Sequence, residues 1–531
     1  MPLHPTDMRL DVTHLLRRAV DRFATADFVV TPERRLTFAD VSEASASLAA
    51  TFVGAGLGKG SRIGAHFSYG PEWVVAWLAA NRIGALYVPL STAYKPAELR
   101  GALRHADVGL LLAPSHLFGV DRRPFVEEAL PSLLAATSPD LQLPESPYLR
   151  GIWLDGPAPP WARAMSVLSG AVDGIVRVPD LIVSAIEDEV RPSDLAISIY
   201  TSGTTAEPKG VVHTQGAIAR KAFSVADSME YVEGDRVFCG MPLFWVGGIA
   251  HQVAPALAVG ATLLCVERPD PEPSLDLMER EQATRLSGWP GVTGPILAHP
   301  SVADRRFPAL DLPVFAPGVL RGGGIGMTET LGGYTTSKGV SVVVPEGERG
   351  SCLGRLIDDF EVRVVDPTTQ SEQPEGTSGA IHVRGYCLMA GLHKHEREET
   401  FTADGWYDTG DKGYLQDGLL YFEGRYKEQI KTSGNNVAPP EVEAVFQAFP
   451  EVAAAHVLGI PDEVRGELVT AALVPAAGQV IDVDDVCDRA RKELSNYKVP
   501  RKVLVLQPAD VPRLATGKPD RLAIRALLAN L

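Results

Sequence analysis

The sequence predicts an α/β protein in which a large N-terminal α/β body of several subdomains precedes a small C-terminal α+β lobe. Its 531 residues are enough for roughly two to four packing units. The first 110 residues alternate helical periodicity with short apolar runs, the pattern of βαβ units around a largely parallel sheet. From Arg425 to the end, Lys plus Arg equals Asp plus Glu at 14 each, whereas the preceding residues are acidic. This change in charge marks the C-terminal residues as a separate unit.

In the N-terminal part, apolar residues at 75–78 and Ile83 predict a helix, and residues 84–90 predict a strand. Residues 120–165 are rich in Pro, Ser and Ala and have no clean period. We therefore expect loops and short helices around the sheet there.

Residues 247–266 carry no charge and are long enough to cross a bilayer. They include His251, Gln252 and Pro255, which favour a buried helix leading into a strand instead. Residues 1–15 are charged and lack the apolar core of a signal peptide. We expect neither a leader nor a membrane span.

The C-terminal lobe is predicted to contain a helix that begins at Pro439, with apolar residues following at helical spacing through Phe449. Residues 489–525 hold ten basic and three acidic residues. Two interpretations stay open for this run: a solvated helix face, or a surface that attracts polyphosphate.

Composition excludes several classes of protein. Hydrophobic residues make up 45% and charged residues 22%, as in globular proteins, which argues against disorder. A net charge of −16 repels nucleic acid and anionic membranes. The five cysteines form no C-x-x-C pair, so neither a disulfide framework nor a zinc ribbon is indicated, and we expect a cytoplasmic protein.

A predicted strand at residues 195–200 leads directly into residues 201–210, TSGTTAEPKG. Hydroxyls, backbone N–H groups at glycines and a lysine are the donors that an anionic phosphate requires. The G-x-x-x-x-G-K spacing of a Walker A loop is absent. A phosphate-binding loop is favoured over an ordinary polar loop.

This loop resembles the signature of the adenylate-forming enzymes, a family that includes acyl-CoA synthetases, aryl-CoA ligases and firefly luciferase. Other family motifs follow in the family's order and extend the resemblance over nearly the whole chain. They are MPLFWVGG at 241–248, GMTE at 326–329, YDTGD at 407–411, GRYKEQIK at 424–431 and PRLATGK at 512–518.

The resemblance implies a ligase with two half-reactions. A carboxylate first attacks the α-phosphate of ATP to give an acyl-adenylate and pyrophosphate, and a thiol, usually that of coenzyme A, then displaces AMP. The implied cofactors are ATP or AMP, Mg²⁺ and coenzyme A, and the implied partner is a small carboxylic acid. The chain would act as a monomer or homodimer, without nucleic acid or membrane.

The resemblance also assigns residues that bind the nucleotide. Asp411 would accept the ribose hydroxyls beside the donor fork of Arg425, Glu329 would offer an oxygen to Mg²⁺, and Thr328 would donate to the α-phosphate. The full implied set is Thr201, Ser202, Gly203, Thr204, Thr205, Lys209, Gly324, Ile325, Gly326, Met327, Thr328, Asp411 and Arg425.

Domain movement is implied as well, between an N-terminal AMP- and acyl-binding domain, residues 1–424, and a mobile lobe, residues 425–531, with a hinge near Lys427. Rotation would withdraw the catalytic Lys518 after adenylation and bring in the loop that begins at catalytic Lys431. The implied coenzyme A channel consists of Ser433, Gly434 and Asn435.

The implied acyl-binding residues are Phe244, Trp245 and Gly248. The segment from 243 to 264 is aromatic and aliphatic, which favours a large apolar acid. The His393-Lys394-His395 run is interpreted as a solvated loop, because no third metal ligand has suitable spacing.

Four departures from the family pattern affect the nucleotide and acyl sites. Ala206 replaces a glycine, Trp245 a histidine and Ile325 an aromatic residue that stacks on adenine. Only 25 residues separate Pro300 from Gly326, too few for the family's strand, turn and helix. Loss of one base–aromatic stack costs roughly 1–3 kcal/mol, so we expect weaker nucleotide binding.

Several functions therefore stay open. One is a complete acyl-CoA ligase, and another is a ligase that performs only thioester formation on an acyl-adenylate from a separate adenylating enzyme. Loading of a carrier protein is a third. A non-catalytic nucleotide- or acyl-binding relative is the last, and the joint presence of Glu329, Asp411, Arg425 and Lys518 argues against it.

Overall fold

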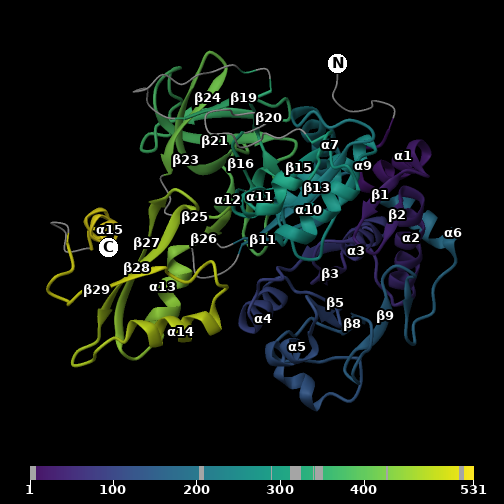
Figure 1. The fold of residues 1–531 in the computed structure, drawn as a ribbon, viewed down its shortest axis with the longest axis horizontal. Coiled ribbons are helices and arrows are strands. Elements are labelled where there is room, and N and C mark those ends of the chain that lie inside the picture. Colours follow the sequence, from purple (N-terminus) through teal and green to yellow (C-terminus); the bar gives the residue numbers. More distant parts are fainter. Residues whose placement is uncertain are drawn as a thin grey trace.

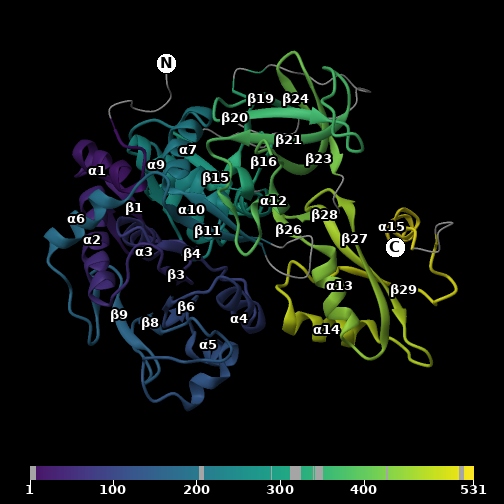
Figure 2. The ribbon, with the colours of Figure 1, turned by 180° about the vertical axis from the view of Figure 1, so that it is seen from behind.

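The computed structural model describes residues 8–201, 209–288, 290–310, 324–338, 340, 351–425, 429–513 and 519–531. Figures 1 and 2 show a large body with a smaller C-terminal lobe, coloured yellow, beside it. The predicted fold class, an α/β body with a C-terminal α+β lobe, is confirmed.

The first sheet of the body has nine strands within the described residues, and its central strands are parallel. Both predicted strands of this region are confirmed, within 84–90 and 195–201. The order is β10 (Ala171–Val172), β9 (Arg163–Ser166), β8 (Gly151–Asp155), β5 (Leu110–Pro114), β3 (Arg62–Ala65), β4 (Leu86–Pro89), β11 (Leu195–Thr201), β12 (Lys209–Thr214) and β22 (Gly391–Leu392).

The prediction for residues 120–165 is wrong in one respect, because β8 and part of β9 are strands of this sheet. Strand β8 is five residues long and extends the parallel order beside β5. A strand this short between proline-rich segments leaves little periodic signal. Nearby lie β6 (His116–Leu117), β7 (Val120–Asp121), α5 (Arg123–Ala129) and a 3₁₀ turn (Pro131–Ala135).

The second sheet has the order β15 (Arg285–Gly288), β13 (Arg236–Gly240), β14 (Thr262–Leu264), β1 (Asp27–Val30) and β2 (Arg35–Thr37). One large apolar core joins strands of both sheets. Its helices include α1 (Val12–Phe23), α2 (Phe38–Gly54), α3 (Pro71–Arg82), α7 (Gln215–Ser228) and α9 (Ala254–Val259). The predicted helix at 75–83 is α3, which is mostly apolar and nearly all buried, as a central helix must be.

The uncharged stretch 247–266 is indeed a buried helix leading into strand β14. It begins with α8 (Val246–Gly248) and a π-helical turn, Ile249–Val253, in which Ala254 N–H donates to the Ile249 carbonyl. Among the described residues, no helix is both long and apolar enough to cross a membrane.

The remaining helices lie over the faces of the two sheets. Helix α4 packs with α5 on the first sheet, and α10 and α11 cover the second. Their bounds are α4 (Pro96–His105), α6 (Asp180–Glu189), α10 (Pro271–Arg280), α11 (Pro290–Leu297), a 3₁₀ turn (Pro300–Asp304) and α12 (Arg397–Thr400).

A third, antiparallel sheet completes the body, in the order β18 (Thr335–Thr336), β19 (Ser351–Leu356), β24 (Leu419–Arg425), β23 (Tyr407–Gln416), β21 (Gly379–Gly385) and β20 (Phe360–Val365). Beside it, β16 (Gly326–Met327) pairs with β17 (Gly332–Gly333) around the 3₁₀ turn Thr328–Thr330. This small hairpin carries the GMTE motif.

The C-terminal lobe is a sheet with helices on both faces. Its strands are β26 (Asn435–Val437), β25 (Ile430–Thr432), β28 (Gly466–Pro475) and β27 (Val452–Asp462), with β29 (Lys502–Val505) on β28. Helices α13 (Pro439–Gln447) and α14 (Val483–Glu493) pack on one face, and α15 (Arg521–Ala529) packs on the other. Helix α13 begins at Pro439, as predicted.

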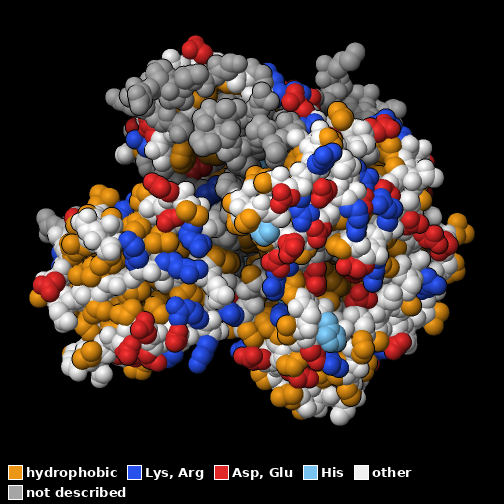
Figure 3. Space-filling view, in the orientation of Figure 1, with side chains coloured by type: hydrophobic (Ala, Val, Ile, Leu, Met, Phe, Trp, Pro, Cys, Tyr) orange, Lys and Arg blue, Asp and Glu red, His pale blue; other side chains and the backbone are white. Residues whose placement is uncertain are grey.

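Charged side chains of α4 and of the segment after α14 join the lobe to the body. The Lys498 ammonium lies 2.7 Å from Glu98 Oε1 and 2.7 Å from Glu441 Oε1, and the Ser495 hydroxyl donates to Glu98 Oε2 at 2.7 Å. Figure 3 shows other Lys and Arg side chains on the surface of the lobe. Lys498 fits neither interpretation of the basic run, because it is buried in ion pairs.

Candidate active site

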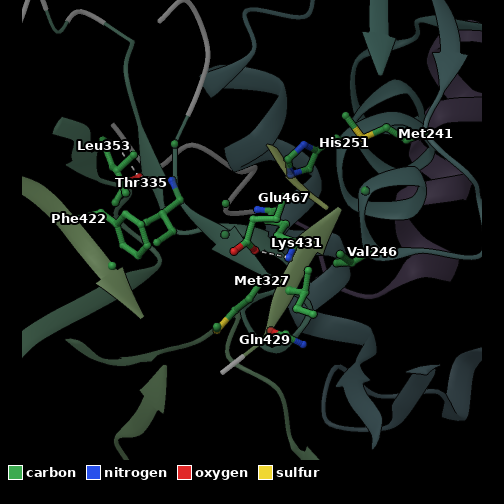
Figure 4. Close-up of a pocket in the computed structure, with 18 of the residues that line it drawn as sticks. Met241, Val246, His251, Met327, Thr335, Leu353, Phe422, Gln429, Lys431 and Glu467 are labelled. Carbon is green, nitrogen blue, oxygen red and sulfur yellow. Dashed lines mark hydrogen bonds between the residues drawn. The ribbon is translucent and has the colours of Figure 1, made fainter. Parts of the chain in front are cut away.

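A cavity of about 830 Å³ lies where the body meets the lobe. Residues of α7, the β16–β17 hairpin, the segment after β13 and strands β25 and β28 line it together (Figure 4). Segments more than 200 residues apart in the chain thus share one space.

The GMTE hairpin forms one wall, through Gly324, Ile325, Gly326 and Met327. Two of these positions require glycine. A Cβ at Gly324 would lie 2.1 Å from the Thr335 carbonyl oxygen, and one at Gly326 would lie 2.5 Å from the backbone of β17. The missing side chains allow the backbone to fold tightly against β17 and β18.

Thr328 and Glu329 follow, held by three hydrogen bonds. His213 Nε2 donates to the Thr328 carbonyl at 2.7 Å, Tyr407 Oη donates to Glu329 Oε1 at 3.1 Å, and Met389 N–H donates to the Glu329 carbonyl at 2.8 Å. Burial lowers the pKa of His213 to about 4, so the ring is neutral at physiological pH.

Asp411 lies in β23, where only 1% of its surface is exposed. Its Cα partner on the neighbouring strand β24 is Arg425, so the chain brings together the two residues expected at the ribose. The adjoining residues Phe422 and Gly424 line the cavity. Strand β24, which pairs with Asp411 through Arg425, therefore lines the same cavity as the GMTE hairpin.

Thr201 and Lys209 are Cα partners at the ends of β11 and β12. The loop between them, with Ser202, Gly203, Thr204 and Thr205, lies outside the described residues. So do the hinge residue Lys427 and the catalytic Lys518.

From the C-terminal lobe, Gln429, Lys431 and Glu467 reach the cavity (Figure 4). The Lys431 backbone N–H donates to Glu467 Oε2 at 2.6 Å, which ties β25 to β28. At the tip of the hairpin, Ser433 and Gly434 take left-handed conformations with φ of 49° and 82°, as a two-residue turn requires. Asn435 Nδ2 donates to the Ser433 carbonyl at 3.3 Å.

The three residues that the resemblance implies for the acyl group do not line this cavity. Phe244 and Trp245 line a second cavity of about 590 Å³, together with Thr201 and helices α4, α13 and α14. Gly248 is buried, and a Cβ there would lie 2.3 Å from the Pro242 carbonyl oxygen. The main cavity is lined instead by Val225 and Ser228 of α7, by Met229 just after this helix, and by Met241, Val246, Gly247 and His251.

Sequence reasoning overlooked these lining residues. Gly247 and His251 are four residues apart, a spacing that places them on the same side of a helix, and this signal was available. No sequence pattern indicates that α7 lines the cavity, because tertiary packing alone brings this helix there.

The His393-Lys394-His395 segment lies away from this cavity. His393 is only 13% exposed and contacts Asp107, with Nε2 at 3.3 Å from Oδ2, so the prediction of a solvated loop is wrong at His393. Lys394 also pairs with Asp107, at 2.8 Å. Among the described residues, no group of three or more His, Cys, Asp or Glu side chains could hold a metal ion.

The GMTE hairpin, an apolar wall and Lys431 of the C-terminal lobe surround one cavity, the arrangement of a two-lobe adenylate-forming enzyme. Comparison with known proteins agrees. The AMP-binding enzyme family matches residues 16–393, and the AMP-binding enzyme C-terminal domain matches residues 441–518. The chain belongs to the AMP-binding enzyme family.

Similar proteins cover nearly the whole chain. The indoleacetate–CoA ligase of Aromatoleum aromaticum is 29% identical over 94% of this chain and 94% of its own. The 3-[(3aS,4S,7aS)-7a-methyl-1,5-dioxo-octahydro-1H-inden-4-yl]propanoyl:CoA ligase of Mycobacterium tuberculosis is 29% identical over 96% of this chain and 98% of its own.

Among solved structures, the o-succinylbenzoate CoA synthetase of Bacillus subtilis, a double mutant bound with a product analogue, has a TM-score of 0.76 at 23% identity. The match covers 96% of this chain and 98% of that one. Together these matches confirm the expected class of enzyme, an AMP-forming acid–thiol ligase that works through an acyl-adenylate. They also support the use of ATP or AMP and of coenzyme A.

Proposed function

We propose that this protein joins a large, mainly apolar carboxylic acid to coenzyme A, and that both half-reactions take place in the 830 Å³ cavity. One observation carries the proposal: the GMTE hairpin, an apolar wall and Lys431 of the C-terminal lobe all line this one space. A nucleotide, an acyl chain and a thiol must meet at one carbonyl carbon, and such a junction provides the place.

The shape of the acyl wall indicates a bulky acid. Val225, Met229, Met241 and Val246 supply apolar surface, and burial of acyl carbons against it contributes about 25 cal/mol per Å². Glycines on the same wall leave width that side chains would otherwise fill. The two ligases described above act, by their names, on indoleacetate and on an octahydroindenyl propanoate, both two-ring acids, which supports this substrate class.

In the first half-reaction, a carboxylate oxygen of the acid bonds to the α-phosphorus of ATP, and the bond to pyrophosphate breaks. Asp411, buried in β23, and Arg425, its Cα partner in β24, would hold the ribose, and Thr328 would donate to the α-phosphate. Lys209 and the hydroxyls and backbone of residues 201–205 would hold the phosphates. Lys518 would stabilise the charge that builds on the reacting oxygens.

Glu329 fits a magnesium site. It is half-buried beside the cavity wall, and its Oε1 accepts from Tyr407 while Oε2 accepts from none of the described residues. Mg²⁺ is held in proteins by one or two carboxylates together with substrate phosphates, and when bound it neutralises charge on those phosphates. Tyr407 then fixes the direction of the carboxylate.

In the second half-reaction, the sulfur of coenzyme A bonds to the acyl carbonyl carbon, AMP leaves with the electron pair of the broken bond, and the thiol proton is released to solvent. The position of the C-terminal lobe in this structure suits this step, because Lys431 faces the cavity from the lobe (Figure 4). Rotation near Lys427 would exchange this arrangement for the adenylating one. We assign the thiol channel to the hairpin tip, Ser433 to Asn435.

A second candidate function is thioester formation alone, from an acyl-adenylate made elsewhere. Ile325 favours it, because this half-buried aliphatic residue packs against the cluster around Tyr334 and presents no ring to adenine. Binding of ATP is then weaker by the loss of one stack, roughly 1–3 kcal/mol. An acyl-adenylate is also held by its acyl chain, so the missing stack weakens its binding less than it weakens the binding of ATP.

The experiment that tests the proposal supplies a panel of ring-containing acids with ATP, Mg²⁺ and coenzyme A, and measures AMP and acyl-CoA by mass spectrometry. We expect equal amounts of both products from bulky apolar acids. Asp411→Ala should raise the Kd for ATP at least tenfold with the fold intact, measured by calorimetry and circular dichroism. Unchanged binding would place the ribose contact elsewhere.

A further inference from the structure

One phenyl ring lies in the wall of the main cavity. Phe422 of β24 carries it, and among the described residues that line this cavity it is the only Phe, Tyr or Trp. The residue is half-buried, so part of its surface stays accessible from the cavity. An aromatic ring in this position offers a flat apolar face to a bound molecule.

Phe422 lies at the opposite end of the cavity from the acyl wall. Figure 4 shows Phe422 and Leu353 at one end, and Met241 and His251 at the other. Lys431 lies between the two ends. An acyl-adenylate likewise has an acyl group at one end and a base at the other, with the reacting carbonyl carbon between them. An acyl group placed against Met241 therefore directs the base toward Phe422.

The wall that carries Phe422 is continuous with the GMTE hairpin. Ile325 N–H donates to Thr335 Oγ1 at 2.8 Å, and the same hydroxyl donates to the Leu353 carbonyl at 2.6 Å. Leu353 belongs to β19, which pairs with β24 so that Ser351 lies opposite Phe422. These hydrogen bonds join the hairpin to the strand that carries the ring, so the position of the ring is fixed relative to the hairpin.

The ring is also close to the residues proposed to hold the ribose. Arg425 follows Phe422 by three residues in β24, and its Cα partner is Asp411. A strand rises about 3.3 Å per residue, so about 10 Å separates positions 422 and 425. Gly424, between them, lines the cavity without a side chain that would fill it. A nucleoside whose ribose is held at this hairpin can therefore reach Phe422 with its base.

We propose that Phe422 stacks on the adenine ring of ATP and of the acyl-adenylate. This inference rests on the proposed function and deepens it, because it names the residue that binds the base and sets the direction of the adenylate in the cavity. Aromatic side chains bind bases in this way because every base has a π face. Ile325 presents no ring, so the stack comes from β24 instead of the hairpin. This assignment favours the complete ligase over thioester formation alone.

The test compares AMP with ribose 5-phosphate, two ligands that share a ribose and a phosphate and differ in the base. Calorimetry measures both dissociation constants for the wild type and for Phe422→Leu, which keeps an apolar side chain and removes the ring. We expect Phe422→Leu to weaken AMP binding roughly 5- to 150-fold, the range for one base–aromatic stack. Binding of ribose 5-phosphate should stay within about twofold of the wild type, because it makes no stack.

Phe422→Trp keeps an aromatic face and also serves if the leucine variant does not fold. It should bind AMP within about fivefold of the wild type. AMP should quench its tryptophan fluorescence more than that of the wild type, and ribose 5-phosphate should not. Tyr421→Leu is the matched control, because Tyr421 is the neighbouring residue of β24 and its ring stacks on Tyr414, with centroids 4.7 Å apart. It should bind both ligands as the wild type does.

Two results would overturn the inference. One is an AMP affinity that Phe422→Leu leaves unchanged, and a raised KM for the acid in the same variant would then place the ring in the acyl wall. The other is an equal loss for AMP and ribose 5-phosphate, which would indicate a structural role. These binding measurements need no turnover, so absence of acyl-CoA from the wild type with every acid contradicts the proposed function separately.

Discussion

At the scale of single residues, the site depends on groups that orient the proposed reactive side chains without touching the substrate. His213 fixes the Thr328 carbonyl, and Tyr407 fixes the Glu329 carboxylate. His213 is buried and Tyr407 is half-buried, so water competes little for the hydrogen bond of His213 and only in part for that of Tyr407. Loss of either hydrogen bond should lower the rate of the reaction more than it lowers the stability of the fold.

Tyr407→Phe removes the hydroxyl that donates to Glu329 and leaves the ring packing in place. Because Glu329 is assigned to Mg²⁺, we expect pyrophosphate release from acid and ATP to fall about 10- to 150-fold, the value of one hydrogen bond to a charged group. The Mg²⁺ concentration for half-maximal rate should rise. An equal loss in acyl-CoA formation from a synthetic acyl-adenylate would contradict this positioning role.

Gly333→Ala tests the width of the cavity beside strand β17. The nearest atom to a Cβ at this position is the Thr335 carbonyl oxygen at 3.4 Å, so the methyl group fits the backbone and takes space from the cavity. We expect kcat/KM to fall about tenfold or more for two-ring acids, and less for a short straight-chain acid. Gly294→Ala, on the exposed face of α11, is the control and should show neither effect.

At the scale of secondary-structure elements, the contact between α4 and the end of α14 determines where the lobe lies. Lys498 is 6% exposed and bridges Glu98 of the body and Glu441 of the lobe. An ion pair this buried is strongly destabilised when one partner is removed, by about 3–5 kcal/mol. The pair therefore favours the arrangement in which Lys431 faces the cavity.

Glu98→Gln removes the interlobe charge while its amide oxygen can still cap α4. We expect acyl-CoA formation from a synthetic acyl-adenylate to slow at least about tenfold, with a smaller effect on pyrophosphate release. Glu441→Gln is the matched control, because it removes the partner within the lobe and leaves the interlobe pair. If both variants behave alike, Lys498 does not hold the lobe in place.

Elements with a strong local pattern were predictable from the sequence. The strand at 195–201 follows from its apolar run, and α13 follows from Pro439 and the spacing of its apolar residues. Strand β8 was missed because its five residues lie between irregular segments, and the π-helical turn has no sequence signal that separates it from an α-helix. These differences come from tertiary context.

The candidate site was predictable where residues are neighbours in the chain or in a hairpin, as with Gly326 to Glu329 or Asp411 opposite Arg425. It was not predictable where distant elements meet. The contribution of α7 to the acyl wall, and the pairing of Lys498 with Glu98, join residues that the sequence separates widely. Neither has a pattern that a single sequence reveals.

At the scale of the whole molecule, buried histidines link stability to pH. Burial lowers the pKa of His66 to about 3, and of His213 and His251 to about 4, from 6.5. The unfolded chain therefore binds more protons than the folded one in this range. The stabilisation is fully present above about pH 6.5 and is lost as the pH falls toward the folded pKa values.

Between pH 7.5 and 5.5, each of these histidines should reduce the free energy of unfolding by about 1.4 kcal/mol. Urea titrations at the two pH values measure the difference. His66→Leu, far from the cavity walls, should make the loss smaller by about one histidine's share. A loss that is the same with and without His66 would show that it does not stay neutral in the folded protein.

The central claim is that one cavity serves both half-reactions, and its most direct measurement is a comparison of two supplies of substrate. Purified wild type and Glu329→Gln receive either a bulky acid with ATP, Mg²⁺ and coenzyme A, or the matching synthetic acyl-adenylate with coenzyme A, and the initial rate of acyl-CoA formation is measured. The account predicts acyl-CoA from both supplies with the wild type, and a loss in Glu329→Gln that is at least about tenfold larger with ATP than with the acyl-adenylate. Acyl-CoA from the acyl-adenylate alone would contradict adenylation by this protein, and acyl-CoA from neither supply would contradict the assignment of the cavity.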